Sequence, residues 1–279
     1  MVVCVQSSTF FFPQKAYRGK TYIGSGTFSK VFVQNDKAVK EIPLEWVTKA
    51  PVNQAKIYNE ISLQQRMSSS DHFPTFHGAF QDDEYIYLES DYISNGTLQK
   101  FVGYRLADDV LLRVFIDMAS FVRDCHDRFI IHKDIKPANF LIDKHLKVYG
   151  TDLGLGISCM YKGLGVYESK FYDGRGSLIY MAPEVYLQGA LNGKCDVWSL
   201  GVVFYEMLFH RFPFHDDYKT LTNSHESWRR SVAYMRCFNE LPERPHDPLV
   251  SIVYDMLDPI AEERPTIHTV LQRLYDIQS

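Results

Sequence analysis

The stretch Ile131-His132-Lys133-Asp134-Ile135-Lys136-Pro137-Ala138-Asn139-Phe140-Leu141-Ile142 decides how the whole sequence is interpreted. It predicts a short polar loop with Asp134, Lys136 and Asn139, placed between a helix and a hydrophobic strand. In such a loop a carboxylate can accept the proton of an attacking hydroxyl, a lysine can stabilise phosphate charge, and an amide oxygen can bind a metal. The combination favours phosphoryl transfer over a capped loop with chance polar residues.

A second part of the expected site follows shortly after this loop. Asp152-Leu153-Gly154 comes after a strand expected at Leu146 to Val148. An aspartate there can hold Mg²⁺ that bridges the phosphates of ATP. The tripeptide alone is common by chance, but its short distance from Asn139 makes it informative. We therefore expect Asn139 and Asp152 to be metal ligands, with Mg²⁺ as the ion and Mn²⁺ as its alternative.

A glycine-rich segment lies upstream, from Ile23 to Val31, between strand-like stretches. Glycines let the backbone approach phosphates closely, and the backbone N–H groups can donate to phosphate oxygens. Ser29 replaces the third glycine of the usual G-x-G-x-x-G pattern, and a plain hairpin turn is the alternative interpretation. The expected nucleotide contacts in this segment are Ile23, Gly24, Ser25, Gly26, Thr27, Phe28, Ser29 and Val31.

A lysine on the next strand is a further candidate for binding phosphate. Lys40 lies in Lys37-Ala38-Val39-Lys40-Glu41-Ile42, on the same strand face as Ala38. Glu60, on the following helix, is its expected ion-pair partner and would hold it toward the phosphates. A solvated strand lysine is the alternative that the segment alone leaves open.

The order of the expected elements predicts an α+β protein with two lobes. Strand-like patterns cover Tyr17 to Ile42 and Phe76 to Glu89, and a helical pattern covers Pro51 to Met67. We expect the rings of Phe10, Phe11 and Phe12 to cover the outer face of the first sheet. The expected organisation is an N-terminal leader (1–16), a β-rich lobe (17–93) and a larger helical lobe (94–279).

Two helices define the larger lobe. Asp108 or Asp109 is expected to cap the first helix, whose buried face would be formed by Leu111, Phe115, Met118, Val122 and Cys125. The second, Val197 to Phe209, is apolar almost all round, which predicts that it is buried.

The composition excludes several classes of function. The 279 residues carry a formal net charge of -4, so nothing indicates a nucleic-acid binder. No apolar run is long enough to span a membrane, no signal peptide is evident, and no glycine follows Met1 as myristoylation would need. The five cysteines, Cys4, Cys125, Cys159, Cys195 and Cys237, show no metal spacing and are expected to be free thiols of an intracellular protein.

Taken together and in this order, the motifs resemble those of the eukaryotic-type protein kinase family over about Tyr17 to Leu274. Gly24-x-Gly26-x-x-Ser29-x-Val31 resembles the phosphate-covering loop, and Ala38-Val39-Lys40 resembles the end of V-A-I-K. His132-Lys133-Asp134 with Asn139 resembles H-R-D…N, and Asp152-Leu153-Gly154 resembles D-F-G. Gly176 to Glu184, which ends in Ala182-Pro183-Glu184, resembles the substrate-facing segment. Asp196-Val197-Trp198-Ser199-Leu200-Gly201 and Arg264-Pro265-Thr266 resemble later landmarks.

The resemblance implies a role for each matched residue. Lys40, paired with Glu60, would contact the α- and β-phosphates of ATP, and Asp134, Lys136 and Asn139 would act at the terminal phosphate. Glu184 and Arg264 would form a buried ion pair. The adenine would meet the backbone at Asp91 and Ile93, lie between Val31, Ala38 and Leu141, and have the small Ser90 at the gatekeeper position.

The type of substrate is also implied by the resemblance. Lys136-Pro137 and Gly176-Ser177 are similar to serine/threonine kinases, so the expected substrates are proteins phosphorylated on Ser or Thr, with Ser177 near Asp134. Glu206 is expected to be structural, although it could attract a substrate arginine. Residues 155–175 contain candidate phosphorylation sites. The substrate consensus and the oligomeric state stay open.

The sequence departs from the family pattern at four places. They are Ser29, Gln64 where an apolar side chain is expected, Lys133 in place of arginine, and Leu153 in place of phenylalanine. Two alternative functions are weighed against a Ser/Thr kinase. A pseudokinase that serves as a scaffold would typically lack one of Lys40, Asp134, Asn139 and Asp152, and a small-molecule kinase of related fold would typically lack Ala182-Pro183-Glu184.

Overall fold

The computed structural model describes residues 12–15, 17–26, 28–159, 178–186, 191–213 and 247–279. It divides into two compact units, and each is described by itself below. The first comprises the described residues up to Ser68 together with Pro74–Tyr92. The second comprises Ser69–Phe73 and the described residues from Ile93 onward.

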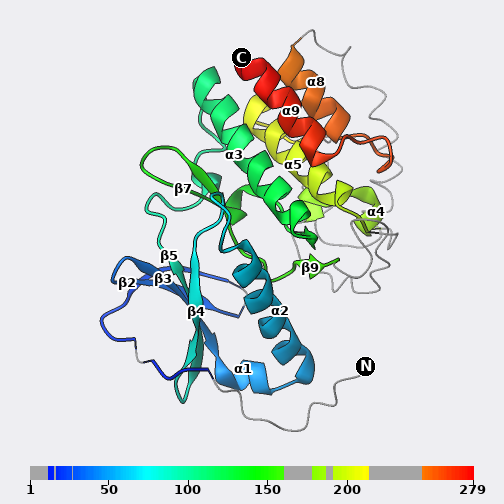
Figure 1. Cartoon of the computed structure of the whole chain (residues 1–279). Coiled ribbons are helices and arrows are strands. Elements are labelled where there is room, and N and C mark those ends of the chain that lie inside the picture. Colours follow the sequence, from blue (N-terminus) through cyan, green and yellow to red (C-terminus); the bar gives the residue numbers. More distant parts are fainter. Residues whose placement is uncertain (1–11, 16, 27, 160–177, 187–190, 214–246) are drawn as a thin grey trace. The chain divides into compact units, whose positions relative to one another are not determined.

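The first unit is built around a five-stranded antiparallel sheet in the order β1-β2-β3-β5-β4 (Figure 1). Its strands are β1 (Thr21–Ser25), β2 (Lys30–Gln34), β3 (Lys37–Pro43), β4 (Phe76–Gln81) and β5 (Tyr85–Asp91), and its helices are α1 (Leu44–Thr48) and α2 (Pro51–Met67). Each strand forms at a short run that contains β-branched or aromatic residues. Pro51 occupies the first position of α2, where its missing N–H costs no helical bond.

One face of this sheet carries the core of the first unit. In β3 the side chains of Ala38, Lys40 and Ile42 alternate with those of the opposite face. Ile42 belongs to an apolar cluster with residues of α1, α2, β4 and β5. The cluster consists of Ile42, Val47, Ile57, Ile61, Phe76, Ile86 and Leu88. The face that α2 covers is therefore also the face that carries Lys40.

The expectation for Phe12 was wrong. Its ring contacts the apolar cluster and lies 6.2 Å from the ring of Tyr58 on α2, so it is on the helix-covered side of the sheet. Gln14 pairs in parallel with Gln81 at the edge of β4, and side chains along such an added strand alternate between faces. On the outer face, Lys15 lies over the ring of Phe80 and Tyr17 packs against Tyr87. Phe10 and Phe11 lie outside the described residues.

The second unit is mainly helical. Its longer helices are α3 (Asp108–Asp127), α5 (Lys194–Phe209), α8 (Pro248–Met256) and α9 (Ile267–Gln278), which lie side by side in Figure 1. Its shorter elements are η1 (Leu98–Lys100), β6 (Ile130–Ile131), η2 (Pro137–Asn139), β7 (Phe140–Ile142), β8 (Val148–Gly150), β9 (Ile157–Ser158), η3 (Leu178–Tyr180) and α4 (Pro183–Tyr186). The β-rich first unit and the helical second unit confirm the predicted α+β fold.

Both helices predicted for this unit are present. The expected apolar face of α3 is buried, and Phe115 stacks on Phe204 of α5 with 3.8 Å between the ring centroids. Helix α5 is buried along nearly its whole length because it is apolar all round.

Two local predictions in this unit were wrong. Asp108 and Asp109 do not cap α3, because the cap position is Ala107 and makes no side-chain cap bond. They lie in the first turn, where negative charge favours the helix dipole. The strand expected at Leu146 to Val148 begins at Val148, since Leu146 has a φ of 63° in a turn closed onto Asp143.

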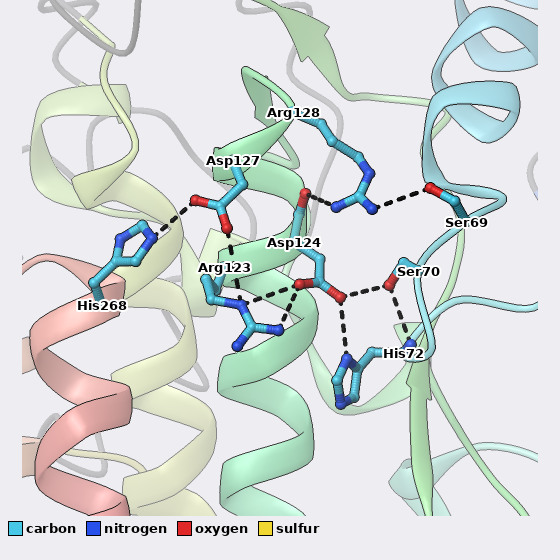
Figure 2. A network of polar contacts seen from close by, with 8 residues as sticks. All are labelled: Ser69, Ser70, His72, Arg123, Asp124, Asp127, Arg128 and His268. Atoms are coloured by element: carbon cyan, nitrogen blue, oxygen red, sulfur yellow. Dashed lines mark hydrogen bonds and ion pairs between the residues drawn. The ribbon is translucent and has the colours of Figure 1, made fainter.

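The connection from α2 to β4 is held to α3 by a polar network (Figure 2). Ser70 Oγ donates to Asp124 Oδ2 at 2.6 Å, and His72 Nδ1 lies 3.0 Å from the same oxygen. Arg123 donates to the other carboxylate oxygen at 2.7 Å. Arg128 donates to Ser69 Oγ at 3.1 Å. All these residues belong to the second unit, so residues 69–73 are held there by polar contacts, of which the bond from Ser70 to Asp124 is buried.

The remaining sequence predictions concern thiols and membranes. Cys125, Cys159 and Cys195 are buried cysteines, whereas Cys4 and Cys237 lie outside the described residues. Within the described ranges, no helix combines the length and apolar character that crossing a membrane requires.

Candidate active site

The polar loop of the sequence motif brings its three candidate catalytic side chains together. Lys136 Nζ donates to Asp134 Oδ2 at 2.7 Å, and Asn139 Nδ2 donates to the same oxygen at 2.9 Å. Pro137 begins the short turn η2, which suits proline because that position needs no N–H donor. The turn folds Asn139 back onto Asp134, whose carbonyl oxygen also accepts from Asn139 Nδ2 at 2.7 Å. Asp134 is therefore a buried carboxylate with two side-chain donors.

The backbone of the loop is held by a carboxylate of α5 that is fully buried. Asp196 accepts the backbone N–H groups of His132 and Lys133, each at 2.9 Å, and lies 3.0 Å from His126 Nε2. Burial acts to raise the pKa of Asp196, but the hydrogen bonds from His126 and from the loop lower it below its usual value. Asp196 is thus ionised at neutral pH and fixes the loop just before Asp134.

His132 connects this loop to the segment that carries Asp152. Its Nε2 lies 3.1 Å from the carbonyl oxygen of Thr151, and its Nδ1 accepts the N–H of Asp134 at 3.2 Å. Both contacts are satisfied by the tautomer that carries its proton on Nε2. Thr151 N–H also donates to Asn139 O at 2.9 Å. Two links therefore place Asp152, the next residue, beside the loop.

Asp152 has the backbone conformation of a residue constrained by its site. Its φ of 63° is in the left-handed region, which is uncommon for a residue with a side chain and is found most often in turns and at functional sites. Leu153, which follows, is fully buried and anchors the segment. Asp152 itself is exposed, so its carboxylate is accessible to a ligand.

The chemistry of Asn139 and Asp152 fits a hard divalent cation. Asn139 directs its amide nitrogen at Asp134, so its amide oxygen faces away from that carboxylate. An amide oxygen and an aspartate carboxylate are oxygen donors of the kind that Mg²⁺ prefers, and Mg²⁺ commonly takes its other ligands from substrate phosphates and water.

The first unit holds the ion pair that the sequence predicts. Lys40 Nζ lies 2.6 Å from Glu60 Oε1, and the Glu60 side chain is 6% exposed. The register of the sheet sets Lys40 opposite both Val31 of β2 and Leu88 of β5, so these side chains share the face that α2 covers. Gln64, one turn after Glu60, donates to Glu60 Oε1 at 3.2 Å. The helix register predicted from Glu60 is therefore the one observed.

The glycine-rich segment forms the hairpin of β1 and β2. Gly26 N–H donates to Ser29 O at 2.9 Å, and a side chain at Gly26 would approach Ser29 Oγ to 2.8 Å. Among the described residues, leaving out its two chain neighbours, no atom lies within 4 Å of where a Gly24 side chain would begin. Phe28 stacks on Trp46 with 4.8 Å between the ring centroids. Ile23 and Ser25 lie in β1, and Thr27 lies outside the described residues.

The expected adenine contacts are found in both units. Ser90 pairs with Ala38 across β5 and β3, so their side chains share the face that carries Lys40. The side chain of Asp91 is on the other face, where Lys37 Nζ donates to it at 2.8 Å. Ile93 and Leu141 belong to the second unit, and Leu141 lies in β7.

The side-chain contacts of Asp91 determine its charge. Partial burial acts to raise the pKa of Asp91, but hydrogen bonds from Lys37 and His77 lower it below its usual value. This carboxylate is therefore part of an ion pair on the outer face of the sheet, and only the backbone of Asp91 remains as the expected adenine contact.

The segment that ends in Ala182-Pro183-Glu184 is braced by two side-chain contacts, of which the first is part-buried and the second is buried. Arg264 donates to both oxygens of Glu184, at 2.7 and 2.9 Å, and its guanidinium lies over the ring of Trp198. Arg264 is fully buried, whereas the Glu184 side chain is 17% exposed, so the expected buried ion pair is buried on the arginine side only. Tyr180 donates to the buried Glu206 at 2.8 Å, so Glu206 has the structural contact expected of it.

Some predicted residues lie outside the described ranges, and two buried residues of α3 were not predicted. Ser177 and most of residues 155–175 lie outside the described residues, so the structure describes nothing of their expected roles. Sequence reasoning missed His126 and Asp124. A signal for both exists, because each is a polar residue at a buried position of the amphipathic helix α3, where a charge needs a partner.

The comparisons with known proteins agree with this geometry. Residues 17–275 match the model of the protein kinase domain. The chain is 29% identical over 259 residues to CBL-interacting protein kinase 26 of Oryza sativa subsp. japonica, which covers 88% of this chain and 49% of that protein. It is 30% identical over 259 residues to CBL-interacting serine/threonine-protein kinase 2 of Arabidopsis thaliana, covering 88% of this chain and 53% of that protein.

A relative with lower identity to this chain is also a named protein kinase. The chain is 27% identical over 264 residues to serine/threonine-protein kinase Nek5 of Mus musculus, covering 90% of this chain and 39% of that protein. The chain thus spans about half the length, or less, of the curated relatives it matches. Because the family match covers nearly the whole chain and includes every residue of the loop around Asp134, the chain belongs to the protein kinase family.

Proposed function

We propose that this chain transfers the γ-phosphate of ATP to serine or threonine hydroxyls of proteins. The observation that carries the proposal is the arrangement around Asp134, whose buried carboxylate accepts from Lys136 and Asn139 beside the segment of Asp152. The relatives reported above carry kinase names, two of them serine/threonine-protein kinase. They support the same reaction class.

Asp134 is the proposed acceptor of the substrate hydroxyl proton. A carboxylate that is held by two donors is fixed in orientation, which lets it align a hydroxyl for in-line attack. Lys136, at 2.7 Å from this carboxylate, would place positive charge beside the transferred phosphoryl group. Asn139 and Asp152 would hold Mg²⁺, which neutralises charge on the phosphates when bound.

Residues of the first unit are proposed to orient the nucleotide. Lys40, held by Glu60, would contact the α- and β-phosphates, and the hairpin around Gly24 and Gly26 would cover them with backbone N–H donors. Val31 and Ala38 would contact the adenine ring together with Leu141, and the backbone at Asp91 and Ile93 would bind its edge. Ser90 would leave space behind the ring.

The protein substrate is proposed only as a class. Lys136-Pro137 after Asp134, and Ser177 in the substrate segment, support serine or threonine as the acceptor. The carboxylate of Glu206 accepts a hydrogen bond from Tyr180, and this contact gives no support to a role of Glu206 in binding a substrate arginine. We propose no consensus sequence.

A phosphotransfer assay on a peptide array tests the proposal. The wild-type chain with Mg-ATP is expected to label serine or threonine peptides, and Asp134→Asn is expected to lower the rate by roughly 10²–10⁴ while ATP binding is retained. Asp276→Asn, an exposed change on α9, serves as the matched control and is expected to match the wild type.

Two outcomes would contradict the proposal. Asp134→Asn activity within a few-fold of the control would remove Asp134 from its proposed role. A wild-type chain that binds Mg-ATP but labels no peptide or protein would be a nucleotide-binding module without transfer activity.

A further inference from the structure

Gln64 is a buried amide on helix α2. It lies on α2 one turn after Glu60, and the two residues are 8% and 5% exposed. Side chains four residues apart in a helix are neighbours, and Gln64 Nε2 donates to Glu60 Oε1 at 3.2 Å. Ile57 and Ile61, the buried neighbours on this helix, cannot donate hydrogen bonds. Gln64 is therefore the polar exception on the buried face of α2 next to the ion pair.

The oxygen that Gln64 contacts is the one that binds Lys40. Glu60 Oε1 accepts Lys40 Nζ at 2.6 Å and Gln64 Nε2 at 3.2 Å, so it has one charged and one neutral donor. A buried carboxylate has lost its water and needs protein donors in exchange. An apolar side chain at position 64 would leave this oxygen with one donor fewer.

The two donors differ in what ATP would do to them. The ammonium of Lys40 is attracted to phosphates, so bound ATP would compete with Glu60 for it. The amide of Gln64 carries no net charge, so phosphates would not attract it as they attract an ammonium, and its bond to Glu60 would persist. We propose that Gln64 is a positioning residue that keeps Glu60 oriented toward Lys40 during the transfer reaction. This inference rests on the proposed kinase function.

The test compares Gln64 with its exposed neighbour. Gln64→Leu removes the donor at similar size, and Gln65→Leu makes the same change on the solvent side of the helix. Gln64→Leu is expected to raise the ATP KM and the Mg-ATP dissociation constant roughly tenfold, the order expected for one hydrogen bond to a charged group. Gln65→Leu is expected to match the wild type in both.

A pH profile separates positioning from packing. Gln64→Glu has nearly the same shape, but burial and the adjacent Glu60 would raise the pKa of the introduced carboxyl. Below that pKa the carboxyl is protonated and can donate to Glu60, and above it the two charges repel. The kcat/KM of Gln64→Glu relative to the wild type is therefore expected to fall as pH rises from 5.5 to 8.5, whereas the same ratio for Gln65→Glu stays level.

A double-mutant cycle identifies the residue through which Gln64 acts. In a Glu60→Gln background, Gln64→Leu is expected to have no further effect on Mg-ATP affinity, because the oriented carboxylate is already gone. Thermal unfolding of every variant checks the fold. An apolar leucine can stabilise such a site, so lower affinity with an unchanged or raised melting temperature would support positioning.

Each contrary outcome is distinguishable. Gln64 variants that match the Gln65 controls in affinity and pH profile would overturn the positioning role while leaving the kinase proposal intact. So would an equal effect of Gln64→Leu with and without Glu60. If the wild type binds Mg-ATP but transfers no phosphate, the kinase proposal fails and the affinity measurements still decide the role of Gln64. A wild type that binds no Mg-ATP overturns both.

Discussion

Ser90 is the residue whose small size has the clearest predicted consequence. It lies opposite Ala38 on the sheet face that carries Lys40, where the adenine is proposed to bind. We expect purine-analogue inhibitors with a bulky substituent to inhibit the wild type, because a serine leaves room that a larger side chain would fill. Ser90→Met is expected to weaken their inhibition by at least about tenfold, since each tenfold step corresponds to about 1.4 kcal/mol of lost contact. Dose–response curves against peptide phosphorylation measure this change.

The control for this prediction is the nucleotide itself. The ATP KM of Ser90→Met is expected to stay within a few-fold of the wild type, which would show that the added side chain excludes only the bulky group. Equal inhibition of both proteins, or none of either, would mean that Ser90 is not at the position assigned to it.

At this scale the sequence was most informative where chemistry limits the choice of residue. The pairing of Lys40 with Glu60 and of Glu184 with Arg264 was predicted from motif order, and both pairs are present. The contact of Gln64 with Glu60 was not predicted, because the expected residue there was apolar. The partner of a buried polar residue can be identified only when its neighbours in the folded structure are known.

Helix α3 carries a pH-dependent contribution to stability through Asp124. Burial acts to raise the pKa of Asp124, but hydrogen bonds from His72, Ser70 and Arg123 lower it below its usual value. A carboxyl with a depressed folded pKa contributes stability above its unfolded pKa of about 3.9, and this contribution is lost as pH falls toward the folded pKa. Asp124→Asn cannot titrate, so its unfolding free energy is expected to fall less steeply than that of the wild type below about pH 4.

Urea unfolding between pH 7 and pH 3 measures this difference. At pH 7 Asp124→Asn is expected to be less stable than the wild type by about 1–3 kcal/mol, because it loses charged hydrogen bonds to the 69–73 connection. Asp127→Asn, on the same helix but half-exposed, is the matched control and is expected to cost less than about 1 kcal/mol. Parallel pH curves for wild type and Asp124→Asn would contradict the role of the network.

The positions of helices with a clear apolar pattern were predicted better than the residues at which helices and strands begin. The positions of α2 and α3 follow from apolar spacing and that of α5 from a continuous apolar run, and each of these patterns depends on many residues at once. The cap of α3 and the start of β8 were wrong because each depends on one or two residues, at Ala107 and at the turn of Leu146. The sheet face predicted for Phe12 was wrong because the position of this residue depends on the pairing of its segment with β4, which no local sequence pattern encodes.

For the whole molecule, the sequence predicted the fold class and the family, since the order of motifs along the chain is itself information. It did not predict that residues 69–73, between α2 and β4, belong to the second unit. That assignment arises from Ser70 and His72 bonding to Asp124, which lies more than fifty residues away in the chain. Long-range polar contacts of this kind leave no periodic trace in the sequence.

The division into two units leads to a prediction about ligand-linked stability. The residues proposed to bind Mg-ATP belong to both units, with Lys40 in the first and Asn139 and Asp152 in the second. A ligand that binds only the folded chain stabilises it, by about 2.7 kcal/mol at one hundred times its dissociation constant. Mg-ATP is therefore expected to raise the melting temperature of the wild type and of Asp134→Asn alike, because Asp134 acts on the acceptor hydroxyl.

Removing the metal should separate the contribution of the proposed Mg²⁺ ligands from that of the residues proposed to contact the nucleotide directly. With EDTA, or in Asp152→Asn, the rise caused by ATP is expected to shrink, because the phosphates lose the cation that offsets their charge. Differential scanning fluorimetry with ATP, Mg-ATP and Mg²⁺ alone measures each part, and the exposed change Asp276→Asn is the matched control. A shift that is the same with and without Mg²⁺ in the wild type would show that Asn139 and Asp152 do not hold the metal. An Asp152→Asn shift equal to that of the control would exclude Asp152 alone.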